Sequence, residues 1–132
     1  GGSMKHTAGL HHVALNVGNL DRSVDFYSRA FGMSVVRRWG DDPRAAMLDM
    51  GDGAILEMFE RPAAAGREGA LIHIALRADD VDAAYKQALA EGASEQTTPR
   101  DVDLQAEEPY AVRIAFVKGP DGEPVELFSE RS

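Results

Sequence analysis

The sequence contains no cysteine. Disulfide bonds, thiolate metal ligands and a nucleophilic cysteine are therefore all excluded. Any metal ion bound by this chain must be held by imidazole nitrogen and carboxylate oxygen, which restricts the search for ligands to His, Asp and Glu.

The sequence also lacks long apolar runs and an excess of positive charge. No run approaches the roughly 20 residues that a transmembrane helix needs, and the first residues show no charged-then-apolar signal pattern. Twenty-two acidic side chains against fourteen basic ones give a formal charge of −8, which repels phosphate backbones and anionic lipid headgroups. We therefore expect a cytoplasmic protein that acts on a small molecule, without nucleic acid or membrane partners.

The apolar residues that are present suffice for one compact domain. Of the 132 residues, 44% are hydrophobic, and a chain of this length buries about two-thirds of the surface that it exposes when unfolded. Gly1-Gly2-Ser3 ahead of Met4 has the composition of an expression-tag remnant. We accordingly predict a single domain over residues 8–132 and exclude residues 1–3 from it.

The first half of the chain predicts a strand, a helix and three further strands. Residues 10–17 alternate, with His12 on the face opposite Val13. Asp21 is expected to cap a helix that ends at Gly32. Turn residues separate the three strand-like runs that follow, at 34–39, 45–50 and 53–59.

The second half repeats this order after a linker of small residues at 61–69. The expected elements are a strand at 70–76, a helix from Asp80 or Asp82 to Gly92, and strands at 110–118 and 123–128. The Thr-, Pro- and acid-rich residues before Tyr110 are expected to be irregular. The sequence therefore predicts an α+β fold of two tandem βαβββ modules, at about residues 8–61 and 69–130.

Two residues recur in both halves at fixed offsets. His73 follows His12 by 61 positions, and Glu126 follows Glu57 by 69, so the second half carries eight extra residues, which we expect in the loop before Tyr110. Each half thus places a His on its first strand and a Glu on its last. This repeat predicts a pseudo-twofold axis on which the four side chains converge as metal ligands.

Each of these four residues also has a simpler interpretation. A lone His on a strand is usually solvent-facing or hydrogen-bonded, and a Glu in an apolar strand can form a salt bridge with arginine. The matched offsets favour the joint interpretation over four separate ones. Two imidazoles and two carboxylates suit zinc, nickel, cobalt, manganese or ferrous iron.

Four segments together carry a family resemblance: residues 12–17 (HVALNV), 19–27 (NLDRSVDFY), 31–33 (FGM) and 116–128 (FVKGPDGEPVELF). They resemble the vicinal oxygen chelate superfamily of glyoxalases, bleomycin-resistance proteins and extradiol dioxygenases, over Leu10 to Phe128. The resemblance is greatest to bacterial glyoxalase I, the lactoylglutathione lyase type. It implies that the two modules form a curved mixed sheet around a central cavity.

The resemblance implies one divalent metal ion bound by His12, Glu57, His73 and Glu126. It further implies a homodimer in which each site takes its first-half ligands from one subunit and its second-half ligands from the other. Members that cleave catechols resemble a His-His-Glu set, so the additional Glu57 favours a lyase or isomerase.

The chemistry implied is proton transfer on a small α-hydroxy or α-keto compound, with a thiol adduct among the candidates. A divalent ion that binds two neighbouring oxygens disperses the charge of an enediolate. The resemblance assigns the general base to Glu126, with Glu57 as the symmetric candidate.

Further residues are candidates for substrate binding. Glutathione-dependent members carry Arg four residues after the first ligand and Asn four after the second, whereas this chain has Asn16 and Arg61 in those places. The swapped pair can still hold a carboxylate, but glutathione itself is not indicated. Strand parity points six more residues at the cavity, with Trp39 near its rim, although ordinary core positions explain them equally well: Met47, Phe59, Tyr110, Ile114, Phe116 and Phe128.

Two other functions fit the same residues. An antibiotic-binding protein of the bleomycin-resistance type would use Trp39, Phe59, Tyr110 and Phe128 as stacking surfaces. An extradiol dioxygenase or a thiol transferase would use His12, His73 and Glu126 without Glu57.

Overall fold

The computed structural model describes residues 10–67, 73–104 and 110–131, and its elements form two modules of the same order. The first contains β1 (His12–Val17), α1 (Leu20–Phe31), β2 (Ser34–Trp39), β3 (Ala45–Asp49) and β4 (Ile55–Glu60). The second contains β5 (Ile74–Arg77), α2 (Val81–Ala90), β6 (Ser94–Leu104), β7 (Tyr110–Lys118) and β8 (Pro124–Glu130). The predicted tag remnant and the start of the predicted strand 70–76 lie outside the described residues.

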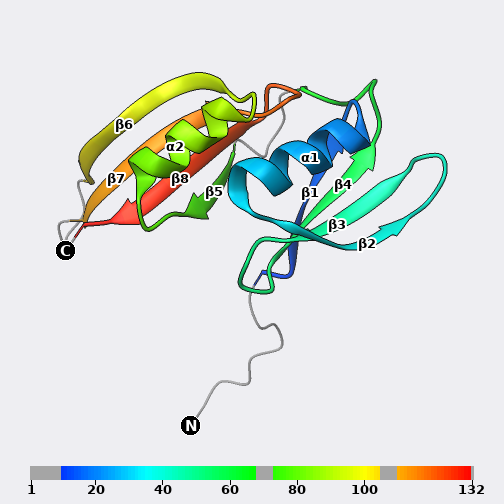
Figure 1. The fold of residues 1–132 in the computed structure, drawn as a ribbon, viewed down its shortest axis with the longest axis horizontal. Helices are drawn as coiled ribbons and strands as arrows, with labels where there is room; N and C mark the ends of the chain where they lie inside the picture. The colour runs from blue at the N-terminus through cyan, green and yellow to red at the C-terminus, as the bar shows by residue number, and fades with distance from the viewer. Residues whose placement is uncertain (1–9, 68–72, 105–109, 132) are drawn as a thin grey trace, which may run out of the picture.

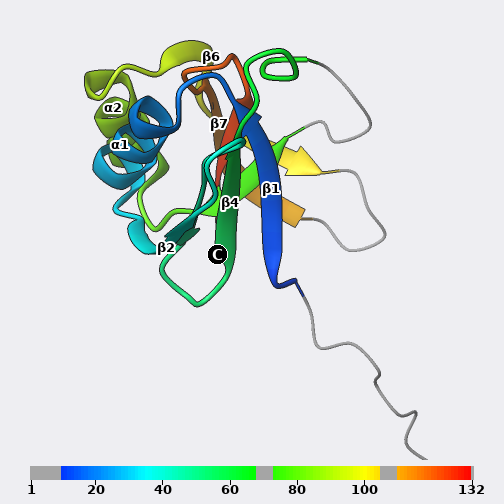
Figure 2. The ribbon, with the colours of Figure 1, turned by 90° about the vertical axis from the view of Figure 1, so that its right-hand side faces the viewer.

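Each module forms its own four-stranded mixed sheet. The strand orders are β1-β4-β3-β2 and β5-β8-β7-β6, with a parallel pair between the first and last strand of each module. The sheets lie side by side with β2 and β6 on the outside (Figure 1), and both helices cover the same side (Figure 2). The predicted α+β fold of two βαβββ modules is confirmed. In the described ranges, no helix is both long and apolar enough to cross a membrane.

Helix α1 packs one apolar face on the first sheet. Val24 and Tyr27 are buried against strand residues such as Leu56, which has no exposed surface. The helix begins two residues earlier than predicted, because Asn19, not Asp21, is the N-cap and accepts a hydrogen bond from the Arg22 backbone. The burial of Leu20 explains the difference, since that residue joins the core from the first helical position. Gly32 ends the helix in the left-handed conformation, as predicted.

Strand β6 is the element that the sequence did not predict. It occupies the stretch expected to be irregular, where Pro99 and several acidic residues argue against a strand. Because β6 lies at the edge of its sheet, a residue without a backbone N–H is tolerated there. The predicted placement of the extra residues in a loop is also wrong: β6 has 11 residues against 6 in β2, and β7 has 9 against 5 in β3.

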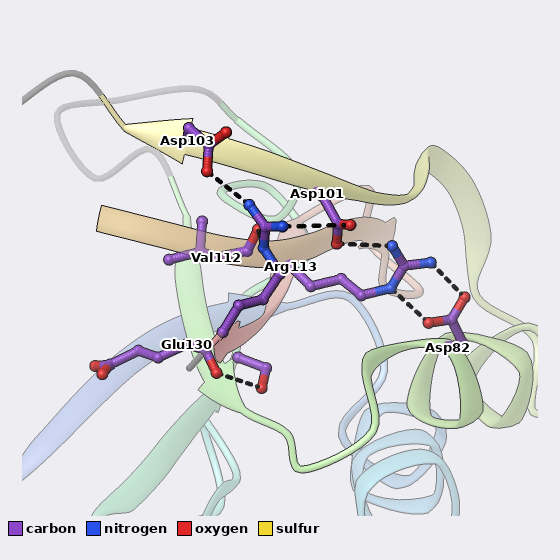
Figure 3. Close-up of polar contacts among 8 residues, drawn as sticks. Asp82, Asp101, Asp103, Val112, Arg113 and Glu130 are labelled. Atoms are coloured by element: carbon purple, nitrogen blue, oxygen red, sulfur yellow. Dashed lines mark hydrogen bonds and ion pairs between the residues drawn. The ribbon is translucent and has the colours of Figure 1, made fainter. Parts of the chain in front are cut away.

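Charged side chains hold β6 and α2 against β7 (Figure 3). Arg113 of β7 donates to Asp82 of α2 at 2.6 and 2.8 Å and to Asp101 of β6 at 3.0 Å. Arg131 donates to Asp103 at 2.7 Å. The hydrogen bonds from Arg113 lower the pKa of Asp82. The acidic residues that suggested a loop are therefore the partners that fix this strand.

The turn between β7 and β8 joins the second module to the first. Asp121 accepts hydrogen bonds from the Gly18 backbone and the Arg22 guanidinium, both at 3.0 Å. Glu123 supports this turn by accepting from the Asp121 backbone at 3.0 Å. Burial raises the pKa of Glu123 above its ordinary value, and the hydrogen bond from Asp121 opposes that effect.

The raised pKa of Glu123 predicts a pH-dependent stability. The folded protein favours the neutral carboxyl. The stability that this preference contributes is complete below the ordinary Glu pKa of about 4.3, and it is lost as pH rises through the higher pKa of the folded protein. Glu123→Gln cannot ionise and keeps the oxygen that accepts from Asp121. We expect its melting temperature to match wild type in acid and to exceed it increasingly toward neutral pH.

Thermal unfolding of both proteins from acid to neutral pH measures this difference. Asp25→Asn, at an exposed position on α1, is the control and should show no such divergence. A Glu123→Gln advantage that stays constant with pH would contradict the assignment.

Candidate functional site

The first His–Glu pair lies across the parallel strands β1 and β4. His12 pairs with Ile55 and Ala14 pairs with Glu57, so the two functional side chains share a face and lie diagonal to one another. His12 Nε2 is 3.5 Å from Glu57 Oε1. Glu57 is only 9% exposed, which makes it one of two buried polar residues among those described.

The second pair has the same arrangement between β5 and β8. His73 directly precedes β5, and Ala75 pairs with Glu126. In both modules, the glutamate therefore pairs with the residue two positions after the histidine. His73 Nε2 is 3.2 Å from Glu126 Oε1. The sequence repeat is thus reproduced in the register of the two sheets.

The two pairs do not meet within one chain. Among residues 10–67, 73–104 and 110–131, no three His, Asp or Glu side chains come close enough to hold one metal ion. Each sheet therefore presents two of the four predicted ligands, and a single chain does not bring all four together.

Each pair has donor atoms that fit a divalent ion. The ion-pair partners of Glu57 and Glu126 in the described residues are His12 and His73, not an arginine as the simpler interpretation required. An imidazole nitrogen beside a carboxylate oxygen is a combination that zinc, nickel, cobalt, manganese and ferrous iron all accept.

His11 is a further histidine beside this site. Its Nδ1 lies 3.0 Å from His12 Nδ1, on the ring nitrogen of His12 that does not face Glu57. If His12 Nδ1 is the donor in this contact, its Nε2 carries no proton and is free to bind a metal ion. Adjacency in sequence was the only signal for this contact.

The predicted substrate residues of the first module gather beside Glu57. Arg61 Nη1 donates to Asn16 Oδ1 at 3.2 Å, so the swapped pair is in direct contact. The Arg61 guanidinium also lies 4.7 Å from the centre of the Phe59 ring, which Trp39 meets edge-on at 6.0 Å. Met47 pairs with Glu57 across β3 and β4 and shares its face.

The predicted substrate residues of the second module gather beside Glu126. Phe116 pairs with Glu126 and lies edge-on to His73, with ring centres 5.2 Å apart. Ile114 pairs with Phe128, and the Tyr110 ring stacks on Phe128 at 6.2 Å. All of the predicted substrate residues thus lie on the two sheet faces that carry the His–Glu pairs.

An open pocket of about 530 Å³ adjoins Tyr110 and Phe128. Arg77, Asp79 and Glu130 are its charged lining residues, and none of them was identified from the sequence. The repeat contained the signal for two of them, because Arg77 follows Asn16 by 61 positions and Glu130 follows Arg61 by 69. Applying the two offsets to the substrate residues as well as to the ligands would have found Arg77 and Glu130.

Known proteins of similar sequence include lactoylglutathione lyases. A "Probable lactoylglutathione lyase" of Vibrio cholerae is 34% identical over 128 residues, covering 91% of this chain and 89% of that protein. A lactoylglutathione lyase of Neisseria meningitidis is 28% identical over 139 residues, covering 93% of this chain and 91% of its own length.

Solved structures of glyoxalase I have a similar fold. The trypanothione-dependent enzyme of Leishmania major superposes with a TM-score of 0.70 at 26% identity, covering 93% of this chain and 87% of that one. Glyoxalase I of Zea mays superposes with a TM-score of 0.73 at 25% identity, covering 93% of this chain and 44% of that one. This chain therefore spans less than half the length of the maize enzyme.

A family model decides the membership. The model described as Glyoxalase/Bleomycin resistance protein/Dioxygenase superfamily matches residues 9–127, nearly the whole chain. Together with the paired four-stranded sheets, this match shows that the chain belongs to the glyoxalase, bleomycin resistance protein and dioxygenase superfamily.

Proposed function

We propose that this protein is a divalent-metal-dependent lyase or isomerase of the glyoxalase I type. Its substrate is a small α-hydroxy or α-keto compound, with thiol adducts included. The observation that carries the proposal is the pair of His–Glu contacts at equivalent register positions of the two sheets. The lactoylglutathione lyases among its relatives support the same reaction class.

The proposed metal site needs two copies of the chain. His12 and Glu57 come from one copy, and His73 and Glu126 from the other. The separation of the two pairs within the described chain supports this division. Nickel, zinc, cobalt, manganese and ferrous iron all remain candidates for this ligand set.

Glu126 is the proposed general base. It removes a proton from the substrate carbon next to the carbonyl and returns that proton to the neighbouring carbon. His73, 3.2 Å away, orients the carboxylate. A divalent ion, when bound, stabilises the negative charge that develops on two neighbouring substrate oxygens. Glu57 is the symmetric candidate for the same role.

The remaining residues bind and shield the substrate. Arg61 and Asn16, already in contact, hold a carboxylate of the substrate between an always-charged guanidinium and an amide. Aromatic rings flank both ligand pairs and exclude water from the reacting carbons, which strengthens the electrostatic interactions there.

Metal content tests the proposal. We expect protein purified without chelator to contain one divalent ion per chain by elemental mass spectrometry, because a dimer has two complete sites. A double variant, His12→Ala with Glu126→Ala, should lose the ion, since each shared site then lacks two of four ligands. A matched double variant at two carboxylates outside the proposed ligand set, Asp25→Ala in α1 and Glu91→Ala at the end of α2, should keep it.

Absence of metal from wild type, even after incubation with nickel, zinc, cobalt and manganese, would contradict the proposal. The protein would then be a ligand-binding relative that uses the aromatic rings alone. Oxygen uptake with catechols after loading with ferrous iron would instead identify a dioxygenase.

A further inference from the structure

The open pocket of the second sheet is a candidate binding site in its own right. Its volume of about 530 Å³ lies within the range of about 300–1,000 Å³ that is usual for small-molecule sites. Arg77 lies four residues after His73, and Glu130 four residues after Glu126. Because side chains alternate along strands, both share the sheet face of the second His–Glu pair.

The charges of this pocket differ from those of its counterpart in the first sheet. The positions equivalent to Asn16 and Arg61 are occupied by Arg77 and Glu130, whereas the aromatic residue is conserved between the halves as Phe59 and Phe128. Asp79 adds a second carboxylate to the lining. The pocket thus combines one cation with two anions beside an aromatic surface.

The carboxylate of Glu130 keeps one oxygen available. The Tyr110 hydroxyl donates to Glu130 Oε1 at 2.6 Å, which orients the side chain, and the contacts among the described residues do not occupy Oε2. The stacked rings of Tyr110 and Phe128 lie at an interplanar angle of 29° and form an apolar wall beside it. None of the ion pairs among the described residues joins Arg77 to Glu130.

We propose that this pocket binds a zwitterionic group of the α-amino acid type, with its carboxylate on Arg77, its ammonium on Glu130 and its carbon chain against Phe128 and Tyr110. A simple anion would meet two carboxylates, and a simple cation would meet an arginine, so a ligand with both charges is the best electrostatic match. The binding of this zwitterionic group does not depend on the proposed function. Only its role rests on that function: the group would be the end of the substrate that lies remote from the reacting carbons.

Three probes that share a phenyl ring separate the charges. L-phenylalanine carries both, 3-phenylpropionate carries only the carboxylate, and phenethylamine carries only the ammonium. We expect L-phenylalanine to shift the backbone NMR signals of Ala78 and Ser129, which line the pocket, and to bind about tenfold more tightly than either single-charge probe, since each charged hydrogen bond adds separately.

Variants assign each charge to its residue. Arg77→Met should remove the advantage of L-phenylalanine over phenethylamine, Arg77→Lys should keep much of it, and Glu130→Gln should remove the advantage over 3-phenylpropionate. Arg29→Met, on the exposed side of α1, is the control and should bind all three probes as wild type does. The same spectra report whether each variant is folded.

Equal binding of the three probes, or shifts confined to the signals around Phe59 and Arg61, would overturn the inference. The titrations use metal-free protein and no turnover. If the probes do not bind, the proposed metal site is therefore not contradicted. If the protein binds no metal, the result of the probe titrations is likewise unaffected.

Discussion

Replacing Glu126 by glutamine is expected to lower kcat by about 10²–10⁴-fold, the usual contribution of a general base. Glutamine keeps the shape of the side chain and one oxygen 3.2 Å from the position of His73 Nε2, but it cannot accept the substrate proton. Because the loss occurs in the chemical step, KM should change much less than kcat. Steady-state rates on a hemithioacetal of methylglyoxal measure both constants.

Glu57→Gln is the matched comparison for this variant. Both carboxylates contact a histidine and occupy equivalent register positions, so the two variants perturb metal binding to a similar degree. We expect the Glu57→Gln enzyme to retain more activity than the Glu126→Gln enzyme at equal metal content. The reverse order would assign the base to Glu57, and equal small losses would show that neither carboxylate moves the proton.

The periodicity of the sequence was sufficient for most of the fold. His12 alternates with buried-side residues in β1, and the spacing of apolar residues in α1 matches the face that the helix buries. These signals are local, so the sequence expresses them directly. The helix cap was misplaced at Asp21 because two residues with cap chemistry, Asn19 and Asp21, precede the helix core.

Strand β6 could not be predicted because its stability is not local. Asp101 and Asp103 have low strand propensity, and Pro99 removes a backbone donor. Their cost is offset by Arg113 and Arg131, which contact them from β7 and beyond β8. Partners 12 and 28 residues away along the chain cannot be read from a window of neighbouring residues.

The sequence identifies candidate residues for a site but not the geometry between them. The matched sequence offsets indicate that the two halves are equivalent; they relate His12 to His73 and Glu57 to Glu126. The offsets do not indicate how far apart the two halves lie, because that distance depends on how the two modules pack. The structure places the two pairs on separate sheets.

Mixing two inactive variants is expected to restore about a quarter of wild-type activity if each site is shared between two copies. His12→Ala damages the first-module half of both sites in its own dimer, and His73→Ala damages the second-module half. In a mixed dimer, one site receives both defects and the other receives neither. Half of the dimers are mixed after random exchange, and each has one intact site of two.

The control pairs His12→Ala with Glu57→Ala, both in the first module. Every site of that mixed dimer contains one damaged first-module half, so co-refolding should restore nothing. If each site were built within one chain, every His12→Ala chain and every His73→Ala chain would lack one of its own four ligands. Mixing these variants would then restore no activity. No recovery in the first mixture, with exchange verified by two affinity tags, would therefore rule out sharing, whereas recovery confined to that mixture requires ligands from two chains.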